Sequence, residues 1–106
     1  MSSYYEVKIS AENQTQADAI LDSLLAKKLA TGGQFLTAPA RFLWKGEIVN
    51  MPHYVTITSY TTENHTASII QDVRKTTVEE VPMVTFVKIN DLSPELRDWI
   101  DQTLRP

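Results

Sequence analysis

The first residues of the chain alternate between apolar and polar side chains, which predicts a strand. Tyr5, Val7 and Ile9 alternate with Glu6 and Lys8. A period of two places successive side chains on opposite faces, as in a strand with one buried face. We therefore expect the chain to open with a half-buried β-strand.

The next segment changes to a helical period. The apolar residues recur three and four positions apart, as on one face of a helix. They are Ala17, Ile20, Leu21, Leu24, Leu25 and Leu29. Asn13 or Thr15 is expected to cap the N-terminus of this helix, and Gly32 and Gly33 are expected to end it.

Residues 34–61 are predicted to form a long antiparallel strand pair. Phe42 and Trp44 lie on its first arm, and Val55 and Ile57 lie on its second arm. Both arms are predicted as strands because they are rich in aromatic and β-branched residues.

Two prolines should bend this pair. Proline cannot donate a hydrogen bond to a ladder, so Pro39 and Pro52 should sit at bulges, edges or strand starts. We expect the chain to reverse between Gly46 and Pro52.

The last part of the chain predicts a helix, a strand and a short helix. The first helix should follow Thr61 and Thr62, which precede Glu63. Its apolar stripe consists of Ala67, Ile69, Ile70 and Val73. Arg74 and Lys75 lie near its end, where positive charge is favourable. A strand is expected over residues 81–89, entered through Pro82. Ser93, Pro94 and Glu95 then form a helix start, followed by Leu96, Trp99, Ile100 and Thr103 at helical spacing.

This order of elements is β-α-β-β-α-β with a terminal helix. It predicts an α+β ferredoxin-like domain over residues 1–106, with both main helices on the same face of a four-stranded antiparallel sheet. The other face would then be left uncovered. A domain of 106 residues buries a limited share of its surface, so association with further copies would add stability.

Composition excludes several kinds of chemistry. The net charge is −3, which argues against a nucleic-acid-binding face. The chain has no cysteine, so it has no disulfide and no thiolate ligand or nucleophile. The N-terminal stretch has neither a basic start nor an apolar run, and nothing approaches the length of a membrane span, so we expect a cytoplasmic protein without membrane contact.

The chain has only two imidazoles, His53 and His65. A transition-metal site would have to combine them with carboxylates such as Glu63, Glu79 or Glu80. No ligand spacing supports such a site, so no metal ligand is assigned. A small metal-handling protein or enzyme using these groups stays open as an alternative.

No catalytic constellation stands out. Glu79 and Glu80 are adjacent, and in an extended segment their side chains would point to opposite faces rather than across one cleft. No nucleophile motif or phosphate-binding loop is present. We expect a protein that is not an enzyme and that has no cofactor.

Tyr54, Thr56, Thr58 and Tyr60 should share one face of a strand. Exposed aromatic residues on such a sheet are typical of RNA-recognition modules, which keeps RNA binding as a second alternative. The acidic charge disfavours it. Contact with a neighbouring subunit is the preferred use of this face, because tyrosine is common at interfaces.

Three short patterns occur in a familiar order. They are Trp44-Lys45-Gly46-Glu47, Glu80-Val81-Pro82, and Leu96 to Ile100 with its Trp99-Ile100 pair. Together they resemble the CutA family of divalent-cation tolerance proteins, from about residue 4 to residue 104. The resemblance implies a ferredoxin-like domain assembled as a homotrimer, similar in architecture to the PII signalling proteins, with a role in the response to metal ions.

The departures from the family pattern fall on side chains that carry lone pairs or charge. Leu29-Ala30-Thr31-Gly32 stands where the family has leucine-alanine-alanine-cysteine, and Tyr60-Thr61 stands where it has lysine-threonine. Over residues 77–83 only glutamate-valine-proline is retained, and the family's histidine is replaced by Thr77. The resemblance implies a cleft between subunits for a small ligand or a weakly bound divalent cation, with Trp44, Tyr60, Thr77, Glu79 and Glu80 as candidate cleft residues.

Overall fold

The computed structural model describes residues 3–106, so Met1 and Ser2 of the predicted domain lie outside the described residues. Its elements are β1 Tyr4–Ala11, α1 Gln14–Ala26, β2 Gly33–Trp44, β3 Glu47–Thr62, the short 3-10 helix η1 Glu63–His65, α2 Thr66–Thr76, β4 Val84–Ile89 and α3 Pro94–Thr103. The strands form one antiparallel four-stranded sheet in the order β2-β3-β1-β4. The predicted α+β ferredoxin-like fold is confirmed.

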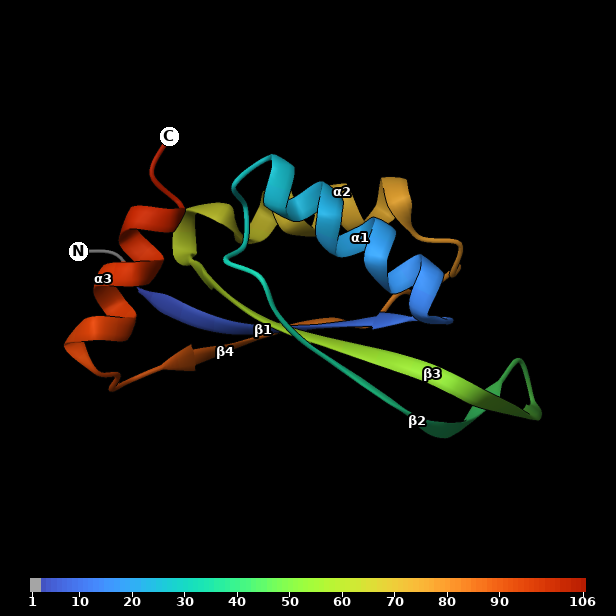
Figure 1. Cartoon of the computed structure of the whole chain (residues 1–106). Coiled ribbons are helices and arrows are strands. Elements are labelled where there is room, and N and C mark those ends of the chain that lie inside the picture. Colours follow the sequence, from blue (N-terminus) through green and yellow to red (C-terminus); the bar gives the residue numbers. More distant parts are fainter. Residues whose placement is uncertain (1–2) are drawn as a thin grey trace.

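The core lies between the sheet and two helices. Figure 1 shows α1 and α2 side by side over the same face of the sheet. Val7 and Ile9 of β1 point into this layer, where they meet Ile20 and Leu24 of α1 and Ile69 of α2, and all five are fully buried. The alternation that predicted β1 therefore reflects burial on one face, as expected.

The opposite face of the sheet carries no helix. We call it the open face, and its members include Glu6, Lys8, Leu36, Thr58, Tyr60 and Val87. Leu36 is 68% exposed and Val87 is 59% exposed. The register of β1 and β3 also puts Tyr54, Thr56, Thr58 and Tyr60 on this face and Val55, Ile57 and Ser59 on the helix face, as the sequence predicted.

The first helix is shorter than predicted. Asn13 caps it by accepting from the Gln16 N–H, but α1 ends at Ala26, before the glycines expected to end it. Lys28 takes a positive φ of 54°, and the Leu29 N–H bonds back to the Leu24 carbonyl, which closes the helix without glycine. Leu29 follows the helix, and Leu25 is partly exposed rather than buried.

Buried hydroxyls hold the segment that follows the helix. The carbonyls of Leu29 and Gly32 accept hydrogen bonds from the Thr61 and Ser59 hydroxyls of β3, at 2.7 and 2.9 Å. These bonds satisfy backbone carbonyls that have no partner within α1. The path of the chain after α1 is therefore fixed by a strand about 30 residues away in the chain.

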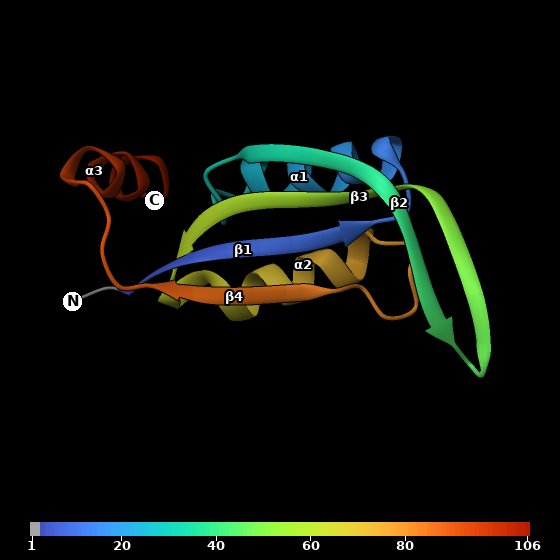
Figure 2. The ribbon, with the colours of Figure 1, turned by 90° about the horizontal axis from the view of Figure 1, so that it is seen from below.

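The β2–β3 hairpin is bent, as the prolines predicted. The register shifts between Ala38 and Ala40, so a bulge lies at Pro39. Beyond it, residues 39–52 form a projecting segment that we call the arm. Figure 2 shows the arm bending around the end of the sheet where α2 leads into β4.

The predicted site of the reversal is wrong by a few residues. Lys45 and Gly46 make the turn, with φ angles of 50° and 81°. Two positive φ values are typical of a tight two-residue hairpin turn, which leaves no loop between Gly46 and Pro52. Residues 47–52 instead continue β3.

Two boundaries in the second half also differ from prediction. Neither Thr61 nor Thr62 caps α2; η1 precedes it instead, and within α2 Ile69 and Val73 are buried whereas Ala67 is exposed and Ile70 is only partly buried. The last strand begins at Val84 rather than at Val81, which is exposed. Arg74 and Lys75 do occupy the last turn of α2.

The terminal helix begins as predicted. Ser93 caps α3 by accepting from the Leu96 N–H at 3.2 Å, and Pro94 occupies the first turn. Ile100 is fully buried, whereas Trp99 is partly exposed. Among the described residues, none of the helices has the length and apolar character needed to span a membrane.

Gly33 offers a test of how closely β2 and β3 approach. A Cβ at this position would lie 1.7 Å from the Thr58 carbonyl oxygen. We expect Gly33→Ala to lower the free energy of unfolding by about 1–3 kcal/mol, as overpacking does, measured by urea unfolding. Gly46→Asn is the control, because that turn is open and asparagine tolerates a positive φ; an equal loss in both variants would contradict this explanation.

Candidate functional site

A cavity lies between the arm and the segment that precedes β4. Its volume is about 410 Å³, and we call it the arm pocket. It is lined by Phe42, Leu43, Trp44, Val49, Met51, Tyr54, Glu79, Glu80, Val81 and Met83. The arm supplies most of the apolar wall, and the pre-β4 segment supplies the two carboxylates.

The arm folds onto the open face at the base of the pocket. The Phe42 ring packs edge-on against Tyr54, with the ring centroids 5.1 Å apart. As a result Tyr54 is 7% exposed, although it belongs to the face that no helix covers. The RNA-binding alternative loses one of its two tyrosines in this way, because a buried ring cannot stack on a base.

Glu79 is held at the base of the pocket by two hydroxyl groups. Its Oε1 accepts from Ser10 at 2.8 Å, and its Oε2 accepts from Tyr54 at 2.7 Å. The Thr77 hydroxyl accepts from the Glu79 N–H at 3.0 Å. Ser10 in turn accepts from the Met83 N–H at 2.8 Å, so this network also sets where β4 begins.

The buried position of Tyr54 changes the pKa of its phenol. Burial is the main cause that raises the pKa of Tyr54, to about 12; the hydrogen bond to Glu79 also raises it, and Ser10 opposes the rise. The phenol therefore stays protonated and donates to Glu79 throughout the neutral range.

Glu80 lies at the rim and interacts with the tip of the arm. Its Oε2 is 3.2 Å from the Lys45 Nζ, and the same Nζ lies 5.3 Å from the centre of the Trp44 ring. Lys45 and Glu80 are both exposed, so this ion pair contributes little to stability. It does show that an ammonium group fits between the Trp44 ring and the Glu80 carboxylate.

The structure brings together three of the five candidate residues. Trp44, Glu79 and Glu80 line the arm pocket, and Thr77 orients Glu79 from the end of α2. Tyr60 lies farther along the open face, about 20 Å along β3 from Tyr54, and within one chain it does not reach the pocket.

The expectation for the two glutamates was wrong. Glu79 and Glu80 line the same pocket instead of facing opposite sides of a strand. The reason is that β4 begins at Val84, so the extended geometry assumed for residues 79 and 80 is absent. They still form no acid–base pair, because one carboxylate binds two hydroxyls and the other binds Lys45.

Sequence reasoning missed Ser10 and Tyr54 as parts of the site. Ser10 lies in β1, is 4% exposed and bonds to Glu79. Tyr54 was correctly placed on its face but not in a pocket. Only the bend at Pro39 could have suggested that the arm would cover it.

The two histidines do not form a metal centre with the predicted carboxylates. His53 is exposed on β3, and His65 lies in η1. Within residues 3–106, no three His, Asp or Glu side chains are grouped so that they could hold a metal ion.

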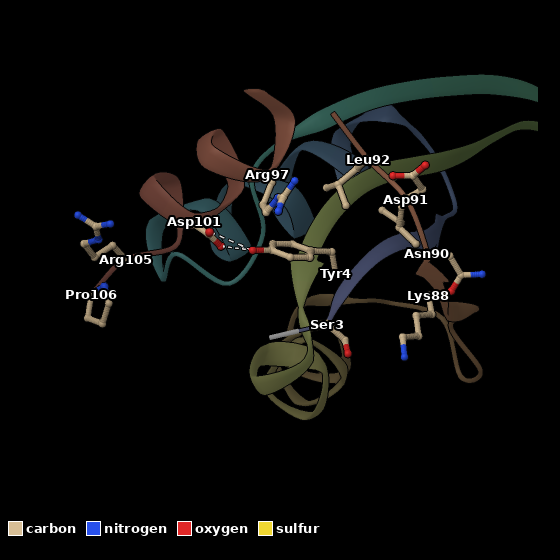
Figure 3. A pocket seen from close by; sticks show the side chains of 11 residues that line it. Ser3, Tyr4, Lys88, Asn90, Asp91, Leu92, Arg97, Asp101, Arg105 and Pro106 are labelled. Atoms are coloured by element: carbon tan, nitrogen blue, oxygen red, sulfur yellow. Dashed lines mark hydrogen bonds between the residues drawn. The ribbon is translucent and has the colours of Figure 1, made fainter. Parts of the chain in front are cut away.

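A larger cavity, of about 890 Å³, lies at the other end of the sheet beside α3. Figure 3 shows the Tyr4 hydroxyl pointing at Asp101, to which it donates at 2.8 and 2.9 Å. Burial and this hydrogen bond raise the pKa of Tyr4. The cations diverge, since Lys88 and Arg105 lie on opposite sides of the view in Figure 3. The cavity therefore lacks a focused anion site, and Tyr4 serves to tie α3 to β1.

The fold and the arm pocket define a class: a small split βαββαβ domain with one open sheet face and a bent hairpin beside an acidic, apolar pocket. Residues 6–103 match the family model of the CutA1 divalent ion tolerance protein. The chain belongs to this family.

Solved structures agree with this assignment. CutA from Archaeoglobus fulgidus, described as a periplasmic divalent cation tolerance protein, is 25% identical with a TM-score of 0.87, covering 99% of this chain and 100% of that chain. The divalent ion tolerance protein CutA1 from Ehrlichia chaffeensis is 15% identical with a TM-score of 0.90, covering 100% and 99%. CutA1 from Oryza sativa is 16% identical with a TM-score of 0.88, covering 97% and 94%. Among curated proteins, no match was found.

The raised pKa of Tyr54 predicts how stability depends on pH. Because this pKa is about 12 in the folded protein against an ordinary 10.0, folding favours the protonated phenol. Its contribution is complete below about pH 10 and is lost as the pH rises towards 12. Urea unfolding from about pH 8 to about pH 11 should show this loss in the unaltered protein.

Tyr54→Phe provides the matching variant. It should lower stability at about pH 8 by about 1 kcal/mol, because Glu79 loses a donor, and it should flatten the fall above pH 10. Tyr4→Phe removes the other phenol with a raised pKa, so it measures how much Tyr4 contributes to the loss of stability at high pH. A Tyr54→Phe variant with the original slope would show that Tyr54 is not the titrating group.

Proposed function

We propose that this chain acts as a non-enzymatic homotrimer of the CutA1 family that serves in the response to divalent cations by binding a small ligand in clefts between subunits. The observation that carries the proposal is the set of large apolar side chains that one chain leaves in water. They are Leu36 and Val87 on the open face and Leu43 and Ile48 at the tip of the arm.

The arm adds to what the open face exposes. Leu43 is 76% exposed and Ile48 is 70% exposed, on either side of the turn. In Figures 1 and 2 the arm projects beyond the end of the sheet. Several large apolar side chains exposed in this way favour contact with another protein surface, and a second and third copy of the chain would supply one.

A binding role accounts for the arm pocket better than catalysis does. Glu79 is fixed by its hydrogen bonds from Ser10 and Tyr54, and the exposed Glu80 forms a weak ion pair with Lys45, so the two carboxylates do not act on each other. A general base needs a proton within its reach and a partner in the reaction. The pocket instead offers an apolar wall with acidic groups at its base and rim, which suits recognition. The cytoplasm remains the proposed location.

Light scattering tests the assembly. We expect a mass three times that of the 12.0 kDa chain at micromolar concentration. Replacing Leu36 and Val87 together by glutamate should dissociate it, because charges buried between subunits are costly. Replacing Ala19 and Ala26 together by glutamate, which adds the same two charges on the exposed side of α1, should leave the mass unchanged. A mass of 12.0 kDa for the unaltered protein would contradict the proposal.

A further inference from the structure

We infer that the arm pocket takes an organic monocation with an apolar body, whose ammonium group replaces that of Lys45 between the Trp44 ring and the Glu80 carboxylate. This inference rests on the proposed ligand-binding role, and it names the class of ligand. Because residues of one chain line the pocket, the ligand class can be tested separately from the number of subunits.

The lining of the pocket selects the charge of the ligand. Its charged members are Glu79 and Glu80, and none of the lining residues is cationic. An anion would lie against two carboxylates, whereas a cation would be attracted by both. A volume of about 410 Å³ lies in the range of small-molecule sites, so the ligand is a compact one.

The apolar wall selects the body of the ligand. Phe42 and Val49 of the arm and Val81 of the pre-β4 segment contribute aliphatic and aromatic surface. Met51 and Met83 also line the cavity, and their flexible thioethers can adapt to ligands of different shape. A hydrated metal ion would gain nothing from such a wall, whereas an alkyl or aryl group would be removed from water.

Lys45 shows where the ammonium group would bind. Its Nζ lies 3.2 Å from Glu80 Oε2 and 5.3 Å from the centre of the Trp44 ring. An aromatic face and a carboxylate around one ammonium form a recognised cation site. Because Lys45 is an exposed residue of the turn, and its ion pair with Glu80 is weak, a ligand can displace it at small cost.

Fluorescence of Trp44 measures this binding. The chain has two tryptophans, so Trp99→Phe leaves Trp44 as the sole reporter, and α3 stands at the other end of the molecule from the arm (Figure 1). The probes are 3-phenylpropylammonium, the neutral 3-phenylpropan-1-ol and the anion 3-phenylpropionate. We expect the ammonium compound to bind about tenfold more tightly than the alcohol and the anion not to bind. Equal affinity for the ammonium compound and the alcohol would overturn the inference.

Two variants test the position of the ammonium group. Lys45→Met removes the internal competitor while keeping the length of the side chain, so it should raise the affinity for 3-phenylpropylammonium severalfold. Glu80→Gln should lower it about fivefold or more. Glu63→Gln removes an exposed carboxylate of η1, at the other end of β3 from the arm, and should change nothing. An unchanged affinity in Glu80→Gln, or a reduced one in Lys45→Met, would overturn the inference.

Measuring the mass of each sample by light scattering distinguishes a failure of this inference from a failure of the proposed trimer. A trimer with no preference for the ammonium probe would refute the ligand class alone. A monomer that binds the probe with the stated pattern would refute the trimer and leave the ligand class standing.

Discussion

The structure depends on the burial of only one face of its sheet. Val7 and Ile9 are fully buried against α1 and α2, whereas Leu36 and Val87, on the other face of the same sheet, remain largely in water. A domain this small gains most of its stability from one apolar layer. The same constraint therefore explains the regular alternation along β1 and the need for a further surface to cover what the helices leave open.

The bent hairpin meets part of that need within the chain. The bulge at Pro39 turns the arm towards the open face, where Phe42 covers Tyr54. Tyr54 then becomes a buried hydrogen-bond donor, and the Glu79 carboxylate is its acceptor. A buried hydroxyl needs such a partner, so the packing of the arm and the position of the carboxylate depend on each other. The pocket is a direct result of the bend.

The fold and the arm pocket of this family member depend on different residues. The fold superposes closely on Archaeoglobus fulgidus CutA at only 25% identity, because many sequences satisfy the same pattern of burial. The arm pocket depends on a few side chains with definite charge, above all Glu79, Glu80 and Lys45. The changes from the family pattern at Gly32, Tyr60 and Thr77 fall outside the lining of that pocket, whereas those at Glu79 and Met83 fall within it. A retained fold can therefore carry a site with its own chemistry.

The sequence by itself determined the order and type of the elements. Burial on one face imposes a period of two or of 3.6 on neighbouring residues, and caps such as Asn13 and Ser93 act within a turn of their helix. The tertiary structure alone decided the path of the chain after α1, where β4 begins and what surrounds Glu79. Each of these depends on a hydrogen bond between residues far apart in the chain, from Thr61 to Leu29 and from Ser10 to Met83 and Glu79. Such partners leave no periodic trace in the sequence, since only the folded backbone brings them together.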